Sequence, residues 1–139
     1  MTSEQSKGVK RRSTVQKRLI LDALKRLNGH ASAGMVLREV QSIDPDIGRA
    51  TVFRVLSSMA DDGELQRLHF SNEDDRFDVT LFPHSHILCK RCGRVDDVWF
   101  DREPELAAHI RDAGGFRVDS VTIELRGLCT DCQKSGGAG

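Results

Sequence analysis

Residues 78–92 read DVTLFPHSHILCKRC and place one carboxylate, Asp78, two imidazoles and two thiols within fifteen positions. Hard oxygen, borderline nitrogen and soft sulfur donors therefore lie close together along the chain, and a further carboxylate, Asp97, follows five positions after the stretch. Because each of these donor types suits a different class of metal ion, the stretch predicts two separate metal sites that lie close together.

All four cysteines of the sequence fall in two C-x-x-C pairs, Cys89 with Cys92 and Cys129 with Cys132. Two such pairs facing one ion are typical of a closed tetrahedral zinc site. Disulfide bonds or a redox-active C-x-x-C pair are the alternatives. The sequence shows no secretory signal peptide, and neither pair lies in an obvious thioredoxin-like unit, so we expect a structural Zn²⁺ ion.

His84 and His86 alternate with apolar neighbours, as on an extended strand whose residues i and i+2 point to the same side. Both imidazoles can then reach one ion, and Asp78 and Asp97 bracket them in the sequence. A mixed histidine and aspartate site exchanges its ligands more readily than a thiolate site and suits iron, manganese or zinc. A pair of solvated surface histidines is the alternative.

The composition is that of an ordinary globular protein of 139 residues, with 38% hydrophobic and 30% charged residues, long enough for one domain or two small ones. No stretch is long and apolar enough to span a membrane. Up to Phe70 there are 12 basic and 8 acidic residues, and after it 9 and 13, so the two halves carry net charges of +4 and −4. Binding to a polyanion would therefore belong to the first half.

Three segments of the first half carry apolar residues at the i, i+3, i+4, i+7 spacing of amphipathic helices. We expect the first two to be capped by Thr14 and Ser32 and the third to begin near Arg49. A hairpin of strands Leu65–Phe70 and Arg76–Leu81 follows. Three helices and a hairpin predict a winged helix-turn-helix, which places its third helix in the major groove of DNA.

The third expected helix keeps its polar side chains off the apolar stripe, on a face suited to phosphates and base edges: Arg49, Thr51, Arg54, Ser57 and Ser58. A solvated charged face is the alternative, but the positive half-chain and the hairpin favour DNA. Residues 1–12 are expected to form a flexible basic arm that ends in Lys10, Arg11 and Arg12, and these could contact phosphates or merely solubilise the chain.

In the second half we expect a strand at Val95–Phe100, a helix at Pro104–Ala113, a strand at Phe116–Leu125 and a disordered tail at 134–139. This half has few apolar residues, so it needs a metal to staple it and a partner to complete its sheet. The predicted fold class is α+β: a winged helix-turn-helix domain at 1–80, then a small zinc-stapled α/β domain at 81–139.

Four motifs, in order and with their spacing, resemble the ferric uptake regulator family of bacterial metal-dependent repressors: ATVFR at 50–54, RFD at 76–78, HSHILCKRCG at 84–93 and GLCTDC at 127–132. The resemblance implies a cytoplasmic transcription regulator without enzymatic activity. It also implies a homodimer, joined through the second domain, that binds a palindromic operator in double-stranded DNA.

The resemblance further implies a regulatory site for Fe²⁺ or Mn²⁺, with Zn²⁺ possible, whose ligands fall on His30, Asp78, His84, His86 and Asp97. From the residues alone, His30 is a lone histidine between two helices. Asp78 in place of glutamate resembles the peroxide-sensing branch, in which bound iron lets peroxide oxidise a ligand histidine; His30 and His84 match those positions. A zinc- or iron-uptake repressor of the same family is the alternative.

The sequence also departs from the family pattern. Pro83, Ser85 and Val121 stand where many members have the ligands of a further metal site. We therefore expect that site to be absent or unable to bind metal normally. Phe53 replaces the tyrosine usual on the recognition helix, which removes a hydroxyl donor from a DNA-contacting position. More distant alternatives are a non-haem metalloenzyme and a zinc-stapled interaction module that does not bind DNA.

Overall fold

The computed structural model describes residues 2–82, 84–102 and 105–136, with the side chains of the first helix described from residue 12 onward. The chain divides into two compact units, Met1–Phe82 and Pro83–Gly139, where the sequence predicted domains at 1–80 and 81–139. Among the described residues, no helix is long and apolar enough to cross a membrane.

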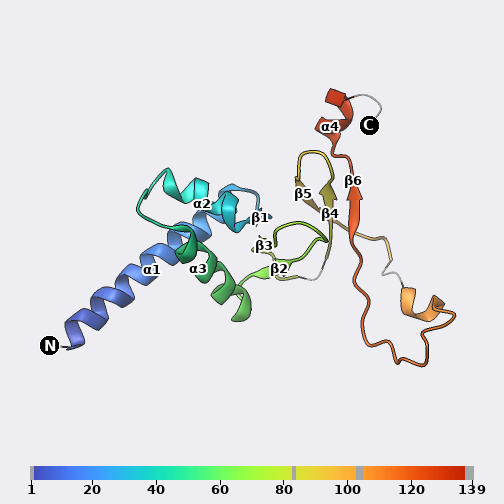
Figure 1. Cartoon of the computed structure of the whole chain (residues 1–139), viewed down its shortest axis with the longest axis horizontal. Coiled ribbons are helices and arrows are strands. Elements are labelled where there is room, and N and C mark those ends of the chain that lie inside the picture. Colours follow the sequence, from blue (N-terminus) through green and yellow to red (C-terminus); the bar gives the residue numbers. More distant parts are fainter. Residues whose placement is uncertain (1, 83, 103–104, 137–139) are drawn as a thin grey trace. The chain divides into compact units, whose positions relative to one another are not determined.

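The first unit contains three helices, α1 (Thr2–Arg26), α2 (Ala33–Gln41) and α3 (Arg49–Asp61), which pack on one another (Figure 1). Each helix turns its apolar stripe into one shared core, where burial of a whole aliphatic side chain stabilises the fold by about 1.5–3 kcal/mol. The large side chains that are completely or almost completely buried in this core are Ile20, Leu24, Val36, Val40, Val52, Leu56 and Phe77.

The turn between α1 and α2 is set by local chemistry. Asn28 and Gly29 have positive φ angles of 64° and 77°, and the Gly29 N–H donates to the Leu24 carbonyl oxygen at 2.9 Å, which ends the helix. The predicted cap of α2 is confirmed, because the Ser32 hydroxyl accepts a hydrogen bond from the Met35 N–H at 3.3 Å. These contacts fix where the chain leaves α1 and enters α2.

The predicted start of the first helix at Thr14 is wrong, since α1 already begins at Thr2. Residues 2–13 contain no proline and several lysine, arginine, glutamine and glutamate residues, which propagate a helix well, so the capping signal of Thr14 does not interrupt it. The predicted flexible arm at 1–12 is accordingly wrong over the described residues 2–12. Lys10 and Arg11 belong to this helix, but their side chains lie outside the described part.

A three-stranded antiparallel sheet with the order β1-β3-β2 completes the first unit. β2 (Gln66–Leu68) and β3 (Arg76–Asp78) form the predicted hairpin, although both strands are shorter than expected. The short strand β1 (Ala31–Ser32) was not predicted; it pairs with β3 in the register Ala31 to Phe77. Three helices and this hairpin confirm the winged-helix prediction.

The second unit is built around the sheet β5-β4-β6, with β4 (Ser85–Cys89) in the middle (Figure 1). β5 (Val95–Val98) pairs antiparallel with β4, and β6 (Leu125–Gly127) pairs parallel with it. A short helix, α4 (Thr130–Gly136), follows β6. The predicted disordered tail at 134–139 is therefore wrong for Lys134 to Gly136, and residues 137–139 lie outside the described part.

Two other predictions for the second unit are corrected. The helix expected at Pro104–Ala113 is reduced to the 3₁₀ turn η1 (Leu106–His109), and Pro104 lies outside the described residues. The strand expected at Phe116–Leu125 is absent apart from Leu125, its last residue, which begins β6. Phe116 in this segment is 82% exposed. A strand requires a hydrogen-bonded neighbour, and β5 and β6 already occupy both sides of β4.

Replacement of Ser32 by alanine should lower the free energy of unfolding of the first unit by about 1 kcal/mol, because the α2 N-terminus loses its side-chain acceptor. Urea unfolding followed by helical circular dichroism measures this change. Ser58→Ala is the control, since Ser58 is an exposed position inside α3 and its loss should change stability by less than about 0.5 kcal/mol. Equal effects of the two substitutions would contradict the capping role of Ser32.

Candidate metal centres and DNA-contacting helix

The four cysteines come together at the end of β4 and the start of α4. Cys89 ends the strand, Cys92 lies in the turn after it, and Cys129 and Cys132 lie just before and within the helix. Their Sγ atoms all lie within 4.8 Å of one another, and those of Cys92 and Cys129 are 3.7 Å apart. Gly93, with φ 79°, lets the first pair turn back on itself.

This geometry fits structural zinc better than a disulfide. A tetrahedron with zinc–sulfur bonds of about 2.3 Å has edges of about 3.8 Å, close to the separation of the Cys92 and Cys129 sulfur atoms. A disulfide bond would require about 2.05 Å. All four cysteines are free thiols in the structure, so their donor type, number and distances match a closed zinc site.

The thiols of the cluster differ in how readily they lose a proton. Backbone N–H groups of Cys129 and Cys92 that donate to the Cys89 sulfur lower the pKa of Cys89 to about 5. Hydrogen bonding with the Cys129 thiol, together with burial, raises the pKa of Cys132 to about 12. One thiolate therefore forms easily, whereas all four form together only when a cation compensates their charge, and zinc affinity falls as the pH falls.

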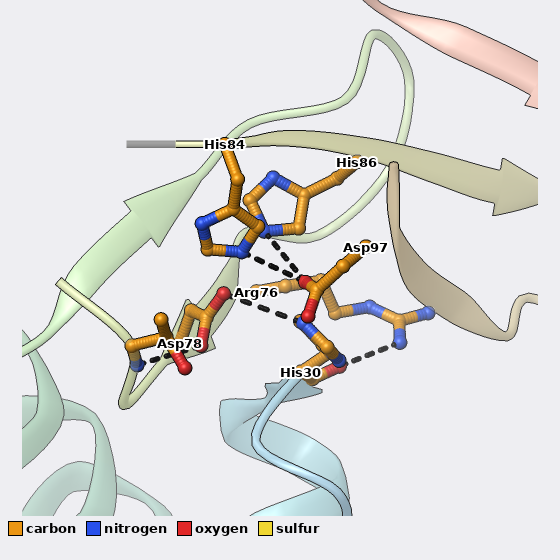
Figure 2. Close-up of polar contacts among 7 residues, drawn as sticks. His30, Arg76, Asp78, His84, His86 and Asp97 are labelled. Atoms are coloured by element: carbon orange, nitrogen blue, oxygen red, sulfur yellow. Dashed lines mark hydrogen bonds and ion pairs between the residues drawn. The ribbon is translucent and has the colours of Figure 1, made fainter. Parts of the chain in front are cut away.

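In the first unit, His30 and Asp78 face each other across the β1–β3 pairing (Figure 2). His30 directly precedes β1 and Asp78 ends β3, so the register that pairs Ala31 with Phe77 places them opposite one another. The Nε2 atom of His30 lies 3.3 Å from Oδ2 of Asp78. Asp78 is buried, and its Oδ1 accepts the Thr80 N–H at 2.8 Å, which fixes the carboxylate.

In the second unit, His84, His86 and Asp97 form a compact donor set (Figure 2). The β4–β5 pairing places His86 directly opposite Asp97. Oδ1 of Asp97 lies 2.7 Å from Nε2 of His84 and 3.5 Å from Nε2 of His86. Trp99 stacks on the His84 ring, with the ring centroids 5.1 Å apart and the planes inclined by 18°.

Two supporting residues were not singled out from the sequence. Arg76 donates from Nη1 to the His30 carbonyl oxygen at 3.1 Å and so supports the turn that presents His30. Trp99 orients His84 by stacking. The i, i+2 relation of Arg76 to Asp78 places both on one face of β3, and Trp99 lies at the same spacing from Asp97, one residue beyond the end of β5; this spacing could have identified both supporting residues.

The outer face of α3 carries the predicted DNA-contacting residues. Val52, Val55, Leu56 and Met59 of this helix are buried, and the opposite side presents Phe53, which is 59% exposed, together with the exposed Arg49 and Arg54. Thr51 and Ser57 are partly buried at the margin of this face. Arg12 on α1 is also exposed.

A winged-helix unit with such a helix, followed by a unit that carries a four-thiol cluster and histidine–carboxylate donors, defines the class of metal-dependent DNA-binding regulators. The sequence model of the ferric uptake regulator family matches residues 7–126, so the chain belongs to that family. It is thus a metal-dependent transcriptional repressor that senses metals or peroxide and not an enzyme, as the sequence predicted, and members of the family bind DNA and are generally dimeric.

The chain is similar to the peroxide-responsive repressor PerR of Staphylococcus saprophyticus, with 32% identity over 136 residues, 96% of this chain and 88% of the relative. It is 29% identical to the peroxide operon regulator of Bacillus subtilis over 88% of this chain and 85% of that protein. Among solved structures, the ferric uptake regulator of Vibrio cholerae superposes with a TM-score of 0.64 at 29% identity, covering 82% of this chain and 88% of that one.

Replacement of Cys132 by serine should abolish zinc binding and unfold the second unit, because the free energy of zinc binding supplies much of the folding free energy of a small domain. Zinc per chain and size-exclusion chromatography measure this outcome. Ser135→Ala, an exposed change on the same helix, is the control and should keep both zinc and assembly. A Cys132→Ser protein without zinc but of native size would contradict the structural role of the ion.

Proposed function

We propose that the chain is a homodimeric repressor that binds a palindromic operator when Fe²⁺ or Mn²⁺ occupies a regulatory site formed by five residues: His30, Asp78, His84, His86 and Asp97. Zn²⁺ held by Cys89, Cys92, Cys129 and Cys132 would support the second unit throughout. Such a regulator would act in the cytoplasm, where its operator DNA lies. The observation that carries this proposal is the presence of an incomplete donor set in each of the two units.

Each donor set alone leaves the coordination shell of the proposed ion incomplete. The first unit offers His30 and Asp78, held 3.3 Å apart, and the second offers two imidazoles around Asp97. Together they supply three nitrogen donors and two carboxylates, a set that suits Fe²⁺ or Mn²⁺ and also accepts Zn²⁺. Because these ligands are neither soft nor closed around the ion, occupancy of the site would follow metal availability.

Ligands divided between two units provide a mechanism for control. His30 and Asp78 can share an ion with the other three residues only when the two units come together, so coordination stabilises that arrangement by its differential affinity. In a dimer, the arrangement sets the separation of the two recognition helices. Both helices can enter major grooves only when they lie about 34 Å apart, one turn of DNA, or a multiple of that distance.

The outer face of α3 supports DNA reading by this helix. Arg49 and Arg54 supply charged donors, and Thr51 and Ser57 supply hydroxyls at the margin of the face. Phe53 has no hydroxyl group and could instead contact a thymine methyl group. Lys10, Arg11 and Arg12 would contact phosphates from α1, which adds affinity for all DNA sequences alike.

The irregular segment between η1 and β6 supports a homodimer. Phe116, Val118 and Val121 are exposed there, although a sequence of this pattern normally packs on one side of a sheet. A second copy of the second unit would offer this segment the neighbour that the described residues of one chain do not provide. This is the partner that the sparse apolar content of the second unit requires.

Peroxide is the signal that the resemblance and the relatives favour. The two bacterial relatives compared above are peroxide regulators, and Asp78 stands where that branch carries aspartate. Bound Fe²⁺ would supply the redox chemistry, and His30 and His84 are the residues expected to be oxidised.

Gel shifts test this proposal on the DNA upstream of the gene that encodes this chain. The protein is loaded with Mn²⁺ or with Fe²⁺ and assayed before and after exposure to peroxide. Loss of binding in the iron form alone, with one oxygen added to a histidine, would support it; equal resistance of both forms would favour a metal-uptake repressor.

Replacement of Arg54 by alanine should weaken operator binding by about 1–3 kcal/mol, with a smaller effect on unrelated DNA, if its guanidinium reads a base edge. Arg12→Ala is the matched comparison, because loss of a phosphate contact should weaken binding to all sequences alike and reduce the salt slope by about 1. Fluorescence anisotropy at several salt concentrations measures both effects. Unchanged operator affinity in both variants would favour an interaction module that does not bind DNA.

Replacement of His30 by alanine should make operator affinity nearly independent of Mn²⁺, because the remaining ligands no longer couple the two units strongly. By linkage, DNA should then also fail to tighten Mn²⁺ binding. Zinc content should stay unchanged, since the cysteines lie elsewhere in the chain. His69→Ala is the control, because His69 is an exposed histidine of the same unit that pairs with Asp75 at 2.9 Å. A full Mn²⁺-dependent gel shift by His30→Ala would refute the coupling mechanism.

A further inference from the structure

Two arginines within or just after the first cysteine pair contact the segment that carries the second pair. Arg91 lies between Cys89 and Cys92, and its Nη1 donates to the carbonyl oxygen of Cys132 at 3.2 Å. Arg94 lies two residues after Cys92, and its Nη1 is 3.7 Å from Oδ2 of Asp131. The polypeptide therefore connects the two cysteine pairs directly, in addition to any bond through zinc.

Arg91 contacts α4, the helix that carries Cys132. A methyl group built on Gly136, at the last position of α4, would overlap the Arg91 guanidinium, which shows that this group lies against the end of the helix. α4 has seven residues, too few for a stable isolated helix. Because Arg91 donates to the Cys132 carbonyl oxygen and its guanidinium lies against the last residue of α4, Arg91 helps to hold Cys132 in place.

Arg94 acts at the other end of the helix, through Asp131 in its first turn. Its Nε lies 2.7 Å from Oδ2 of Asp96, which aims the guanidinium toward α4. The side chains of Arg94 and Asp131 are 48% and 82% exposed, so solvent screens this pair and its effect should be the smaller of the two.

Charge gives both arginines a second role beside the zinc site. Four thiolates around one Zn²⁺ carry a net charge of −2, which nearby cations can compensate. Groups around the ligands of a metal site orient those ligands, and their loss typically weakens metal binding by about 10–100-fold. Arg91 combines both effects, since it donates to the backbone of a ligand residue and brings a permanent charge.

We propose that Arg91 and Arg94 are positioning residues of the zinc centre, forming a clamp that holds α4 over the ion and sets the rate at which zinc is lost. The clamp rests on the four-cysteine zinc site proposed above. Neither arginine binds the ion itself. Arg91 is the principal member, because it donates directly to the residue that carries the fourth ligand.

Zinc release from the full-length, zinc-loaded protein into an excess of a chromogenic chelator tests the clamp. Arg91→Gln should release zinc about tenfold faster than the unmodified protein, and Arg94→Gln only about twofold to threefold faster. Arg91→Lys keeps the charge without the planar fork and should fall between Arg91→Gln and the unmodified protein. Arg117→Gln is the matched control, because Arg117 pairs with Asp119 in the same unit and should leave the rate unchanged.

Gly136→Ala provides a test that removes no charge. The added methyl group must displace the Arg91 guanidinium, so zinc release should again accelerate even though every cation and thiol is retained. If Arg91→Gln does not fold, this variant decides the proposal alone. Release rates of Arg91→Gln or Gly136→Ala equal to that of Arg117→Gln would overturn the clamp. An unmodified protein that purifies without zinc would instead overturn the zinc site itself.

Discussion

The second unit depends on the convergence of four thiols, because its core is too small to fold it alone. Its buried apolar side chains, among the described residues, are Leu88 and Val95 together with two of the cysteines. The first unit, by comparison, buries a continuous cluster drawn from three helices and a strand. A domain with so little buried apolar surface usually needs a cross-link or an ion, so we expect zinc binding and folding to be coupled in this half of the chain.

The strand β4 links the cysteine cluster to the candidate regulatory donors. Cys89 ends β4 and His86 lies three positions earlier, so the two side chains point to opposite faces of one strand. The register that places His86 opposite Asp97 also places Leu88 opposite Val95, next to the first cysteine pair. Whatever holds Cys89 in place also holds the β4–β5 register, and that register holds the histidine–carboxylate set.

Patterns within one segment could be predicted from the sequence, and features that need a distant partner could not. The third helix was predicted from its apolar periodicity and begins at Arg49 as expected, and the start of α2 follows from the Ser32 cap; both are local signals. The strand β1 has two residues and exists only because β3 lies beside it. The segment after η1 has the alternation of a strand but lacks a neighbour among the described residues, so alternation alone gave the wrong prediction there.

The candidate donors divide in the same way. The cysteine pairs and the His84–His86 pair were predicted because the spacing within each pair lets both of its side chains reach the same ion. His30 was predicted as a ligand only from the resemblance to the family, since no other donor lies near it in the sequence. The structure supplies the missing physical reason, which is that β1 pairs with β3 and thereby places His30 against Asp78.

Donor chemistry explains how one chain can keep a permanent ion and an exchangeable one. Four thiolates in a closed tetrahedron favour zinc, which undergoes no redox chemistry. The ion dissociates slowly because every ligand must dissociate or be protonated. Imidazole and carboxylate donors suit harder ions than thiolates do, and they bind these ions less tightly than four thiolates bind zinc. Cellular availability then decides which ion occupies the site. Redox-active iron would thus be confined to nitrogen and oxygen ligands, while zinc occupies the thiols that peroxide would otherwise attack. If peroxide oxidises a regulatory ligand as proposed, separation of the reactive site from the thiolate site would allow the fold to survive the reaction.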